Sequence, residues 1–440
     1  MLGIVASRAD EASVRVAERL RAVAEWERIA DDGPAGWRTD GAELREISEI
    51  HVEMADPAPL FEQRPDLVAV VSRHAGDTGP LLTAHHTGNV GPAAYGGEPN
   101  EFAPAAPAAH RRTLGALADH APEGYDVGTE ATHHGPTDVS VPFLFVELGS
   151  AETQWRDDAA AEAVARATLA LRGVEPRTER SVAVFGGGHY APRVERLVRE
   201  TDWSVGHVAP DWGVETLDSL AAQVETFGRM LDASGTRLAL VDGERPDLTE
   251  ALSRADARVV SETWLRETDG VALSLTDRLE AALGPVDEGT RFGSPARETN
   301  AETAFETRAL PAGLAEAAGG VDAAAATAAV AGEALAYGTA DGGSRPAGRV
   351  ALAASGAYDR IVAELADVIR EQYDTVTVAE DRVIARRLAF DPDRARTLGV
   401  PEGPAFGRLA SGEAVEVRGE VIPPEQVSRE VEDVFETPDR

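Results

Sequence analysis

The stretch SVAVFGGGHYAPRVERLVRE, residues 181–200, decides the class of fold that we expect for this chain. Its first residues, SVAVF, form a short, mostly apolar run that is typical of a buried strand, and the three glycines after it predict a tight turn. Pro192 stands early in the next segment, where proline favours the first turn of a helix. A strand that passes through a glycine turn into a helix is the repeating unit of α/β proteins.

The same alternation continues on both sides of this stretch. Apolar runs typical of strands cover residues 2–7, 67–72, 81–86, 127–133, 143–149, 204–209 and 237–242. Helical spacing or a helix-start signal marks residues 10–26, 110–121, 150–171 and 215–231. We therefore expect an α/β domain over residues 1–285, with a mixed, mainly parallel sheet flanked by helices.

The sequence changes character after about residue 284. Residues 286–348 are rich in alanine and glycine, and a weak helix or a flexible connector fits them equally well. Residues 349–440 regain regular apolar runs, which predict a smaller C-terminal α+β appendage. Within it, residues 390–427 resemble a segment of the tRNA-processing metallo-hydrolase ribonuclease Z without its metal-binding motif, which indicates a structural module.

The amino-acid composition indicates the salt environment of the protein and the kinds of partner that it can bind. The net charge is −34, and all 42 basic residues are arginine, which fits a cytoplasm at very high salt. Acidity disfavours nucleic acid at ordinary ionic strength. In molar salt, however, the Debye length falls to about 3 Å, so an RNA substrate is not excluded.

Several classes of protein are disfavoured by what the sequence lacks. Without cysteine, the chain has no disulfide framework, no Cys-ligated zinc and no thiol nucleophile. The N-terminus does not read as a signal peptide, and no stretch approaches the roughly 20 apolar residues of a membrane span. We expect a soluble, cytoplasmic monomer that does not contact a membrane.

All ten histidines lie between His51 and His207. Seven of them stand at or just past predicted strand ends beside glycine: His74, His85, His86, His133, His134, His189 and His207. Ligands of α/β sheets bind beyond strand carboxyl ends, and neutral imidazole is a common metal ligand. We favour one shared site over separate, internally satisfied histidines. Successive strand side chains point to opposite faces, so one member of each adjacent pair should line the site unless a turn begins between them.

Other polar groups surround these histidines. The glycine turn at 186–188 suits close approach of a ligand, and the free N–H groups of the next helix favour an anion such as a terminal phosphate, although a plain tight turn is the alternative. Asn89, beside Gly88, could donate a hydrogen bond to an oxyanion. Glu130 and Glu147 could act as a base or a ligand, the alternative being solvated surface carboxylates.

Three blocks carry a resemblance to a known family: SRHAGDTGPLLTAHHTGNVG (72–91), EATHHGPTDVSVPFLFVELGSAETQW (130–155) and GGGHYAPR (186–193). In order and in spacing they resemble the archaeal and plant type of D-aminoacyl-tRNA deacylase. Members are zinc-dependent hydrolases that cut the ester between a D-amino acid and the tRNA 3′ end. The resemblance implies a fold like that of peptidyl-tRNA hydrolases and phosphorylases.

The resemblance and the residue patterns together give the predicted site. We expect catalytic roles for His74, His85, Asn89, Glu130 and Glu147. We expect two Zn²⁺ ions among His85, His133, His134 and His189. We expect substrate contacts from Gly88, Gly187, Gly188, Tyr190, Arg193 and His207. His86 replaces a residue that is usually apolar in the family, so His85 is preferred to it.

Two other functions remain open from the sequence. One is a non-catalytic tRNA- or nucleotide-binding protein that uses its histidines structurally. The other is a zinc-dependent amidohydrolase that acts on small acyl compounds.

Overall fold

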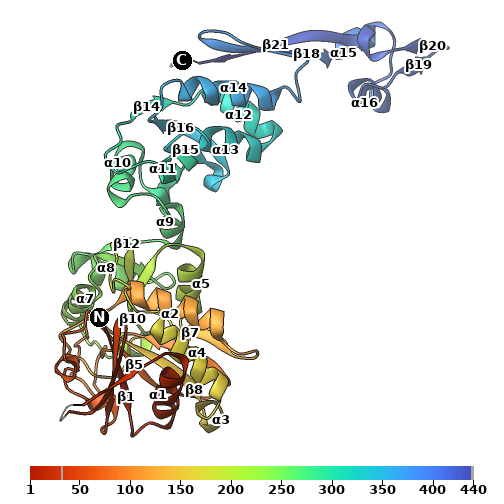
Figure 1. Ribbon diagram of the computed structural model, residues 1–440. Coiled ribbons are helices and arrows are strands. Elements are labelled where there is room, and N and C mark those ends of the chain that lie inside the picture. The colour runs from red at the N-terminus through yellow and green to blue at the C-terminus, as the bar shows by residue number, and fades with distance from the viewer. Residues whose placement is uncertain (31–32, 438–440) are drawn as a thin grey trace. The chain divides into compact units, whose positions relative to one another are not determined.

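The computed structural model describes residues 1–30 and 33–437, which divide into two compact units, Met1–Leu265 and Arg266–Arg440 (Figure 1). The division precedes the expected boundary near residue 285. The reason is that helix α10 (Leu273–Leu283) packs on strands β15 (Ala336–Ala340) and β16 (Arg345–Leu352), which belong to the second unit.

The first unit contains an eight-stranded sheet of order β2-β3-β4-β1-β5-β8-β6-β7. Its strands are β1 Leu2–Ser7, β2 Glu27–Ile29, β3 Ala35–Thr39, β4 Ala42–Ile47, β5 Leu67–Ala75, β6 Leu81–His85, β7 Asp126–Thr129 and β8 Phe143–Ser150. Strands β4, β1, β5 and β8 are parallel neighbours, whereas β6 runs antiparallel to β8. The predicted mixed, mainly parallel sheet is confirmed.

Both faces of this sheet are covered. All residues of β1 and β8 are buried, which suits strands with packed layers on either side. Helices α1 (Glu11–Val23) and α4 (Asp158–Leu169) pack together and contact β5 and β8. A separate apolar cluster contains Met54, Phe61 and Val141 from the connecting segments together with Phe143 and Phe145 of β8.

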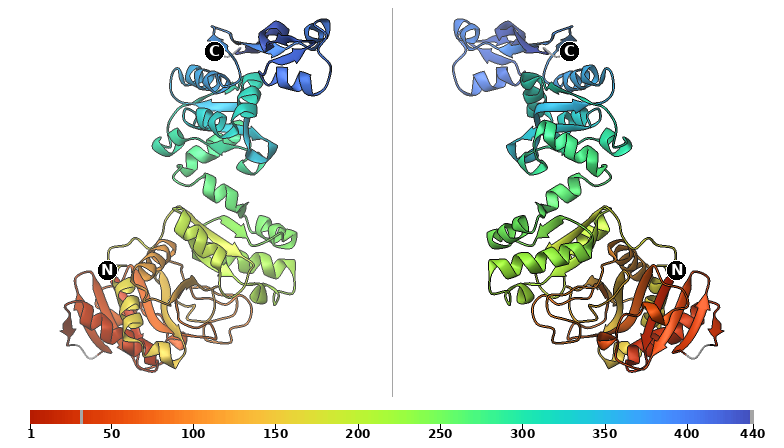
Figure 2. Two further views of the ribbon diagram at one scale, coloured as in Figure 1. Left: turned by 90° about the vertical axis from the view of Figure 1, so that its right-hand side faces the viewer. Right: turned by 90° about the vertical axis from the view of Figure 1, so that its left-hand side faces the viewer.

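A second, fully parallel sheet of order β10-β9-β11-β12 completes the first unit (Figure 2). Its strands are β9 Ser181–Phe185, β10 Ser204–Ala209, β11 Leu238–Val241 and β12 Arg258–Val260. The unit's other helices are α2 Pro107–His120, α3 Glu152–Trp155, α5 Pro192–Glu200, α6 Asp211–Val214, α7 Leu220–Ser234 and α8 Pro246–Arg254, with α9 Glu262–Glu267 at its end. The core here joins Phe185 of β9 to Phe227 and Met230 of α7.

The second unit is α+β, as predicted for the C-terminal part. A four-stranded antiparallel sheet orders β13 (Arg291–Phe292), β15, β16 and β14 (Glu306–Ala309). Its helices are α10, α11 Ser294–Glu298, α12 Ala312–Val321, α13 Ala323–Ala331 and α14 Ala357–Ile369. The alanine-rich segment therefore forms two helices, whose Leu314, Ala318 and Val330 are buried against α14 and the sheet.

The chain ends in smaller antiparallel elements. A three-stranded sheet joins β17 (Thr375–Val378), β18 (Arg382–Phe390) and β21 (Ser428–Glu436). Between β18 and β21 lie α15 Pro392–Thr397, α16 Pro404–Ala410 and the hairpin of β19 Val415–Val417 and β20 Glu420–Ile422. Over residues 1–30 and 33–437, none of the helices combines the length and the apolar character that crossing a bilayer requires.

Candidate functional site

Five segments of the first unit bring histidine and glutamate side chains together. These residues come from β5, β6, β8, the loop after β7 and the turn after β9. They form three overlapping groups in which the candidate ligand atoms lie within 4.8 Å of one another: His85/His133/His134, Glu130/His133/His189 and His74/Glu130/Glu147. His133 belongs to two groups and Glu130 to two, so the groups make one continuous cluster that could hold metal ions.

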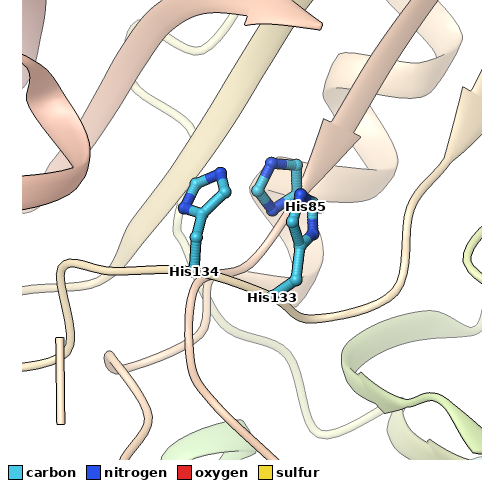
Figure 3. Close-up of side chains that lie close together, drawn as sticks. All are labelled: His85, His133 and His134. Carbon is cyan, nitrogen blue, oxygen red and sulfur yellow. The ribbon is translucent and has the colours of Figure 1, made fainter. Parts of the chain in front are cut away.

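The first group consists of imidazoles alone (Figure 3). Nδ1 of His85 lies 3.1 Å from the carbonyl oxygen of His86, and Nδ1 of His133 and His134 lies 2.8 and 2.7 Å from those of Ala131 and Gly135. A carbonyl only accepts, so each Nδ1 carries a hydrogen. This arrangement leaves Nε2 of each ring as the nitrogen that could ligate a metal, as second-shell carbonyls do in known sites.

His133 and His134 present their rings to the same side of their loop, as Figure 3 shows. His134 has a φ of +45°, in the left-handed region, so the chain turns between the two residues instead of alternating as a strand. Both therefore join the first group. Burial lowers the pKa of His133 to about 4 and places that of His134 well below its usual range, so both rings are neutral.

Glu130 lies at the centre of the cluster and is 1% exposed. Its Oε2 lies 2.8 Å from Nε2 of His189 and 3.8 Å from Nε2 of His133, and its Oε1 lies 3.2 Å from Nδ1 of His74. Burial raises the pKa of this carboxyl, but its histidine neighbours outweigh burial and hold the pKa well below its usual range. Glu130 is thus a buried carboxylate, not a solvated surface group.

Glu147 forms the second buried carboxylate. Ser72 donates a hydrogen bond to its Oε1 at 2.7 Å, and His85 Nε2 lies 3.5 Å from the same oxygen. Burial and Glu130 raise the pKa of Glu147, but His74 and His85 outweigh them and lower it. Burial lowers the pKa of His85, whereas Glu147 raises it and gives a net increase. The proton thus favoured on His85 is one that a bound metal ion displaces.

His74 connects the two carboxylates to the surface. Its Nδ1 lies 3.2 Å from Glu130 and 3.6 Å from Glu147, and its Nε2 lies 2.9 Å from the hydroxyl oxygen of Tyr190. Burial lowers the pKa of His74, but the two carboxylates outweigh burial and raise it to about 10. The charged imidazole donates from both nitrogens, so the Tyr190 oxygen accepts and its own hydrogen is directed elsewhere.

His207 does not join this cluster. It is fully buried, its Nε2 lies 2.9 Å from the carbonyl oxygen of Ala103, and its Nδ1 lies 3.0 Å from the hydroxyl of Thr132. The substrate contact expected of His207 is replaced by an internal role, because both nitrogens are already bonded. His86 likewise lies outside the three candidate ligand groups and packs beside His110 and His207.

Asn89 and Gly88 also have structural roles that differ from those expected. The Asn89 side-chain amide donates to the carbonyl oxygens of Gly96 at 3.0 Å and Glu98 at 3.2 Å, so its hydrogens hold the loop and not an oxyanion. Gly88 donates its N–H to the His134 carbonyl at 2.9 Å. A Cβ at Gly88 would lie 2.4 Å from the Phe102 ring, so only glycine fits.

The glycine turn is occupied by the chain's own carboxylates. The Gly187 N–H donates to Asp211 at 3.1 Å, and Arg193 forms 2.8 Å ion pairs with Asp242 and Glu262. A cavity of about 70 Å³ beside the turn is lined by Gly188, Arg193 and Asp242 among others. The expected phosphate site at Gly187, Gly188 and Arg193 is therefore opposed by charge, because carboxylates already accept from Gly187 and Arg193.

Sequence comparisons connect this cluster to known proteins. The protein-family model described as D-aminoacyl-tRNA deacylase matches residues 61–260 of this chain. These residues include all members of the three groups. The D-aminoacyl-tRNA deacylase of Natronomonas pharaonis is 51% identical, and the match covers 99% of this chain and 100% of the relative. The chain belongs to the D-aminoacyl-tRNA deacylase family.

Other members of the family extend the comparison. The D-aminoacyl-tRNA deacylase of Halorubrum lacusprofundi is 49% identical over 98% of this chain and 95% of its own length. That of Methanoculleus marisnigri is 31% identical over 82% of each chain. A crystal structure of the conserved protein of unknown function AF0625 has 26% identity and a TM-score of 0.55, and covers 61% of this chain and 98% of its own. The strongly acidic composition, which fits very high salt, agrees with the haloarchaeal origin of the Natronomonas and Halorubrum relatives.

Proposed function

We propose that this protein hydrolyses the ester bond of D-aminoacyl-tRNA and releases a free D-amino acid and tRNA. Family membership supports the proposal, because the relatives that match nearly the whole chain are named for this reaction. The observation that carries it is the cluster in which five histidine imidazoles meet two buried carboxylates. Such a donor set suits metal-assisted hydrolysis of an activated ester.

We propose zinc as the metal, with two ions per chain. His85 and His134 would hold one ion, and Glu130 and His189 would hold the other. His133 has one unprotonated nitrogen, Nε2, and would complete the ligand set of one of the two ions. The donors fit, because they are nitrogen and carboxylate oxygen, and within the described residues His85 Nε2 is buried without a hydrogen-bond partner. Bound zinc lowers the pKa of a water molecule to about 7 and polarises a carbonyl.

The chain's own residues would handle the protons. Glu147, oriented by Ser72, is the acceptor for the proton of the attacking water. As the carbon–oxygen bond to the ribose breaks, the leaving 3′ oxygen needs a proton. We assign this donation to the Tyr190 hydroxyl, because Tyr190 is 36% exposed and its hydroxyl oxygen contacts the charged His74.

The test is incubation with D- and L-aminoacylated tRNA in molar salt, with and without a chelator. Cleavage of the D-ester, its loss on chelation and its return with added zinc are expected. Binding of tRNA without cleavage by zinc-loaded, folded protein would contradict the proposal and favour a binding protein. Cleavage of N-acyl amino acids with none of charged tRNA would favour an amidohydrolase.

We also propose that the protein acts as a monomer in the cytoplasm. All candidate ligands come from one copy of the chain, so the site needs no partner subunit. A substrate that serves translation places the reaction in the cytoplasm. Size-exclusion chromatography with light scattering in molar salt checks the oligomeric state.

A further inference from the structure

Exposed apolar side chains of the first unit are few and of one kind. Among its described residues, 1–30 and 33–265, the large apolar side chains left exposed are Tyr95 at 75%, Trp212 at 48% and Tyr190 at 36%. All three are aromatic and, as their hydrogen bonds show, all three lie on segments that adjoin the metal-binding cluster. Single exposed apolar residues are ordinary on protein surfaces, so the informative observation is where these lie.

Tyr95 lies in the loop between β6 and α2, and this loop is fixed to the segment that carries the candidate ligands. Its carbonyl oxygen accepts the N–H of Gly135 at 3.0 Å, and Gly135 directly follows His134. The next turn of the loop is held by the Asn89 amide, which donates to Gly96. The ring of Tyr95 is therefore carried on an ordered backbone beside His134, although the ring itself is mostly in solvent.

Trp212 lies in the short helix α6 that follows β10, and this helix is fixed to the glycine turn. The N–H of Asp211 donates to the Gly187 carbonyl at 2.9 Å, and the Asp211 carboxylate accepts the Gly187 N–H at 3.1 Å. Gly213 packs on the start of the Tyr95 loop, since a Cβ there would lie 2.8 Å from the Val90 carbonyl oxygen. Thus α6 contacts both the turn that precedes His189 and the loop of Tyr95.

We propose that Tyr95 and Trp212 stack against the unpaired 3′-terminal nucleotides of tRNA and so present the ester to the metal-binding cluster. This inference rests on the proposed function and adds the means by which RNA is held. Unpaired RNA ends are recognised largely by stacking of bases on aromatic side chains. Every base has a π-face, so two aromatic rings suit a terminal sequence shared by many substrates.

The charges around the site favour stacking over phosphate contacts. Arg193 is paired with Asp242 and Glu262, and Arg245 is paired with Asp211 at 2.8 Å and Asp247 at 3.1 Å. These arginines have little net positive charge to offer a phosphate. Molar salt weakens phosphate contacts further, whereas the contact of a base with an aromatic ring does not depend on ion pairing.

The experiment compares Tyr95→Ala and Trp212→Ala with the ring-keeping controls Tyr95→Phe and Trp212→Phe. Both rings are exposed, so the variants should fold, which circular dichroism checks. In molar salt, each alanine variant should raise KM for D-aminoacyl-tRNA about 10-fold, more than it lowers kcat, because one stacked base is lost. The phenylalanine variants should keep most of the affinity.

A binding measurement separates this inference from the proposed function. The probe is the trinucleotide CCA without an amino acid, which represents the unpaired 3′ end of tRNA. In molar salt it should quench the tryptophan fluorescence of the wild-type protein. The quenching should be absent in Trp212→Phe and weaker in Tyr95→Ala. If the protein cleaves D-aminoacyl-tRNA while all variants keep the wild-type KM, stacking is overturned and the function stands. If CCA quenches but no ester is cleaved, the function fails and stacking stands.

Discussion

The hydroxyl oxygen of Tyr190 lies 2.9 Å from Nε2 of His74, although the two residues are 116 positions apart in the chain. His74 ends β5 of the eight-stranded sheet, and Tyr190 follows β9 of the four-stranded sheet. Tyr190, the proposed proton donor, and His74, whose charged imidazole donates to the Tyr190 oxygen, thus come from segments of different sheets. The cluster therefore depends on how the two sheets meet.

Replacing Tyr190 with phenylalanine tests the proton donor. The variant keeps the ring and removes the hydroxyl, so we expect kcat for D-aminoacyl-tRNA to fall about 100-fold, which is typical of a lost general acid. KM should change far less than kcat. Steady-state kinetics in molar salt measure both, and a wild-type kcat would exclude the proposed role of the hydroxyl.

His133 lies where two of the ligand groups meet, so His133→Ala should remove a ligand from the ion that its Nε2 would bind. We expect loss of bound zinc and a fall in hydrolysis of roughly 100-fold or more, as for other ligand and near-ligand losses. Plasma mass spectrometry of the dialysed protein counts the metal. The matched control is His120→Ala, since His120 is an exposed histidine at the end of α2 and should retain both metal and rate.

Glu130→Gln separates charge from shape at the centre of the cluster. Glutamine has nearly the same size but leaves His74, His133 and His189 without their shared carboxylate. We expect metal affinity to fall about 10- to 100-fold. Titration with zinc against a competing chelator measures this affinity, and an unchanged value would remove Glu130 from the ligand set.

Buried neutral histidines away from the ligands predict how stability depends on pH. Burial lowers the pKa of His110 to about 4, below its unfolded value near 6.5. The unfolded state therefore binds more protons between pH 6.5 and pH 4, and stability should fall as the pH falls through this window. The cost should be on the order of 2 kcal/mol for one such group.

His110→Gln provides the control for that dependence. Glutamine can still donate toward the Ala84 carbonyl, which His110 Nε2 approaches at 3.1 Å, but it does not titrate. Urea unfolding at pH 5 and pH 7, at constant high salt, should show a smaller pH effect in the variant than in the wild-type protein. Equal pH effects in the two proteins would show that His110 does not contribute.

Local patterns were enough to predict much of the first unit. Apolar runs and glycine turns are local signals, and they located β1, β5, β8 and β9. Strand β4 was not predicted, because it carries a buried ion pair. Arg45 donates to Glu43 at 2.7 Å, and both side chains are about 1% exposed. That pair makes a buried strand look polar. The predicted helix over 150–171 is divided because Asp157 caps a second helix.

The contacts of the candidate site residues were harder to predict than their clustering. Histidines near glycines predicted a shared cluster, and the structure brings most of them together, but His207 and Asn89 bond to backbone carbonyls. Tertiary structure determines which partner a polar side chain bonds to, and no local pattern in the sequence identifies that partner. Ser72 was missed for the same reason, since a lone serine at a strand end gives no sign of the carboxylate that it orients.

The backbone of Glu130 pairs with that of Tyr190, where the Ala131 N–H donates to the His189 carbonyl at 2.7 Å and the Ala191 N–H donates to Thr129 at 3.0 Å. A growing chain contains His85 and His133 before Tyr190 has been synthesised. Partial translation products therefore lack the finished cleft. On the proposed function, ester cleavage awaits the joining of the two halves.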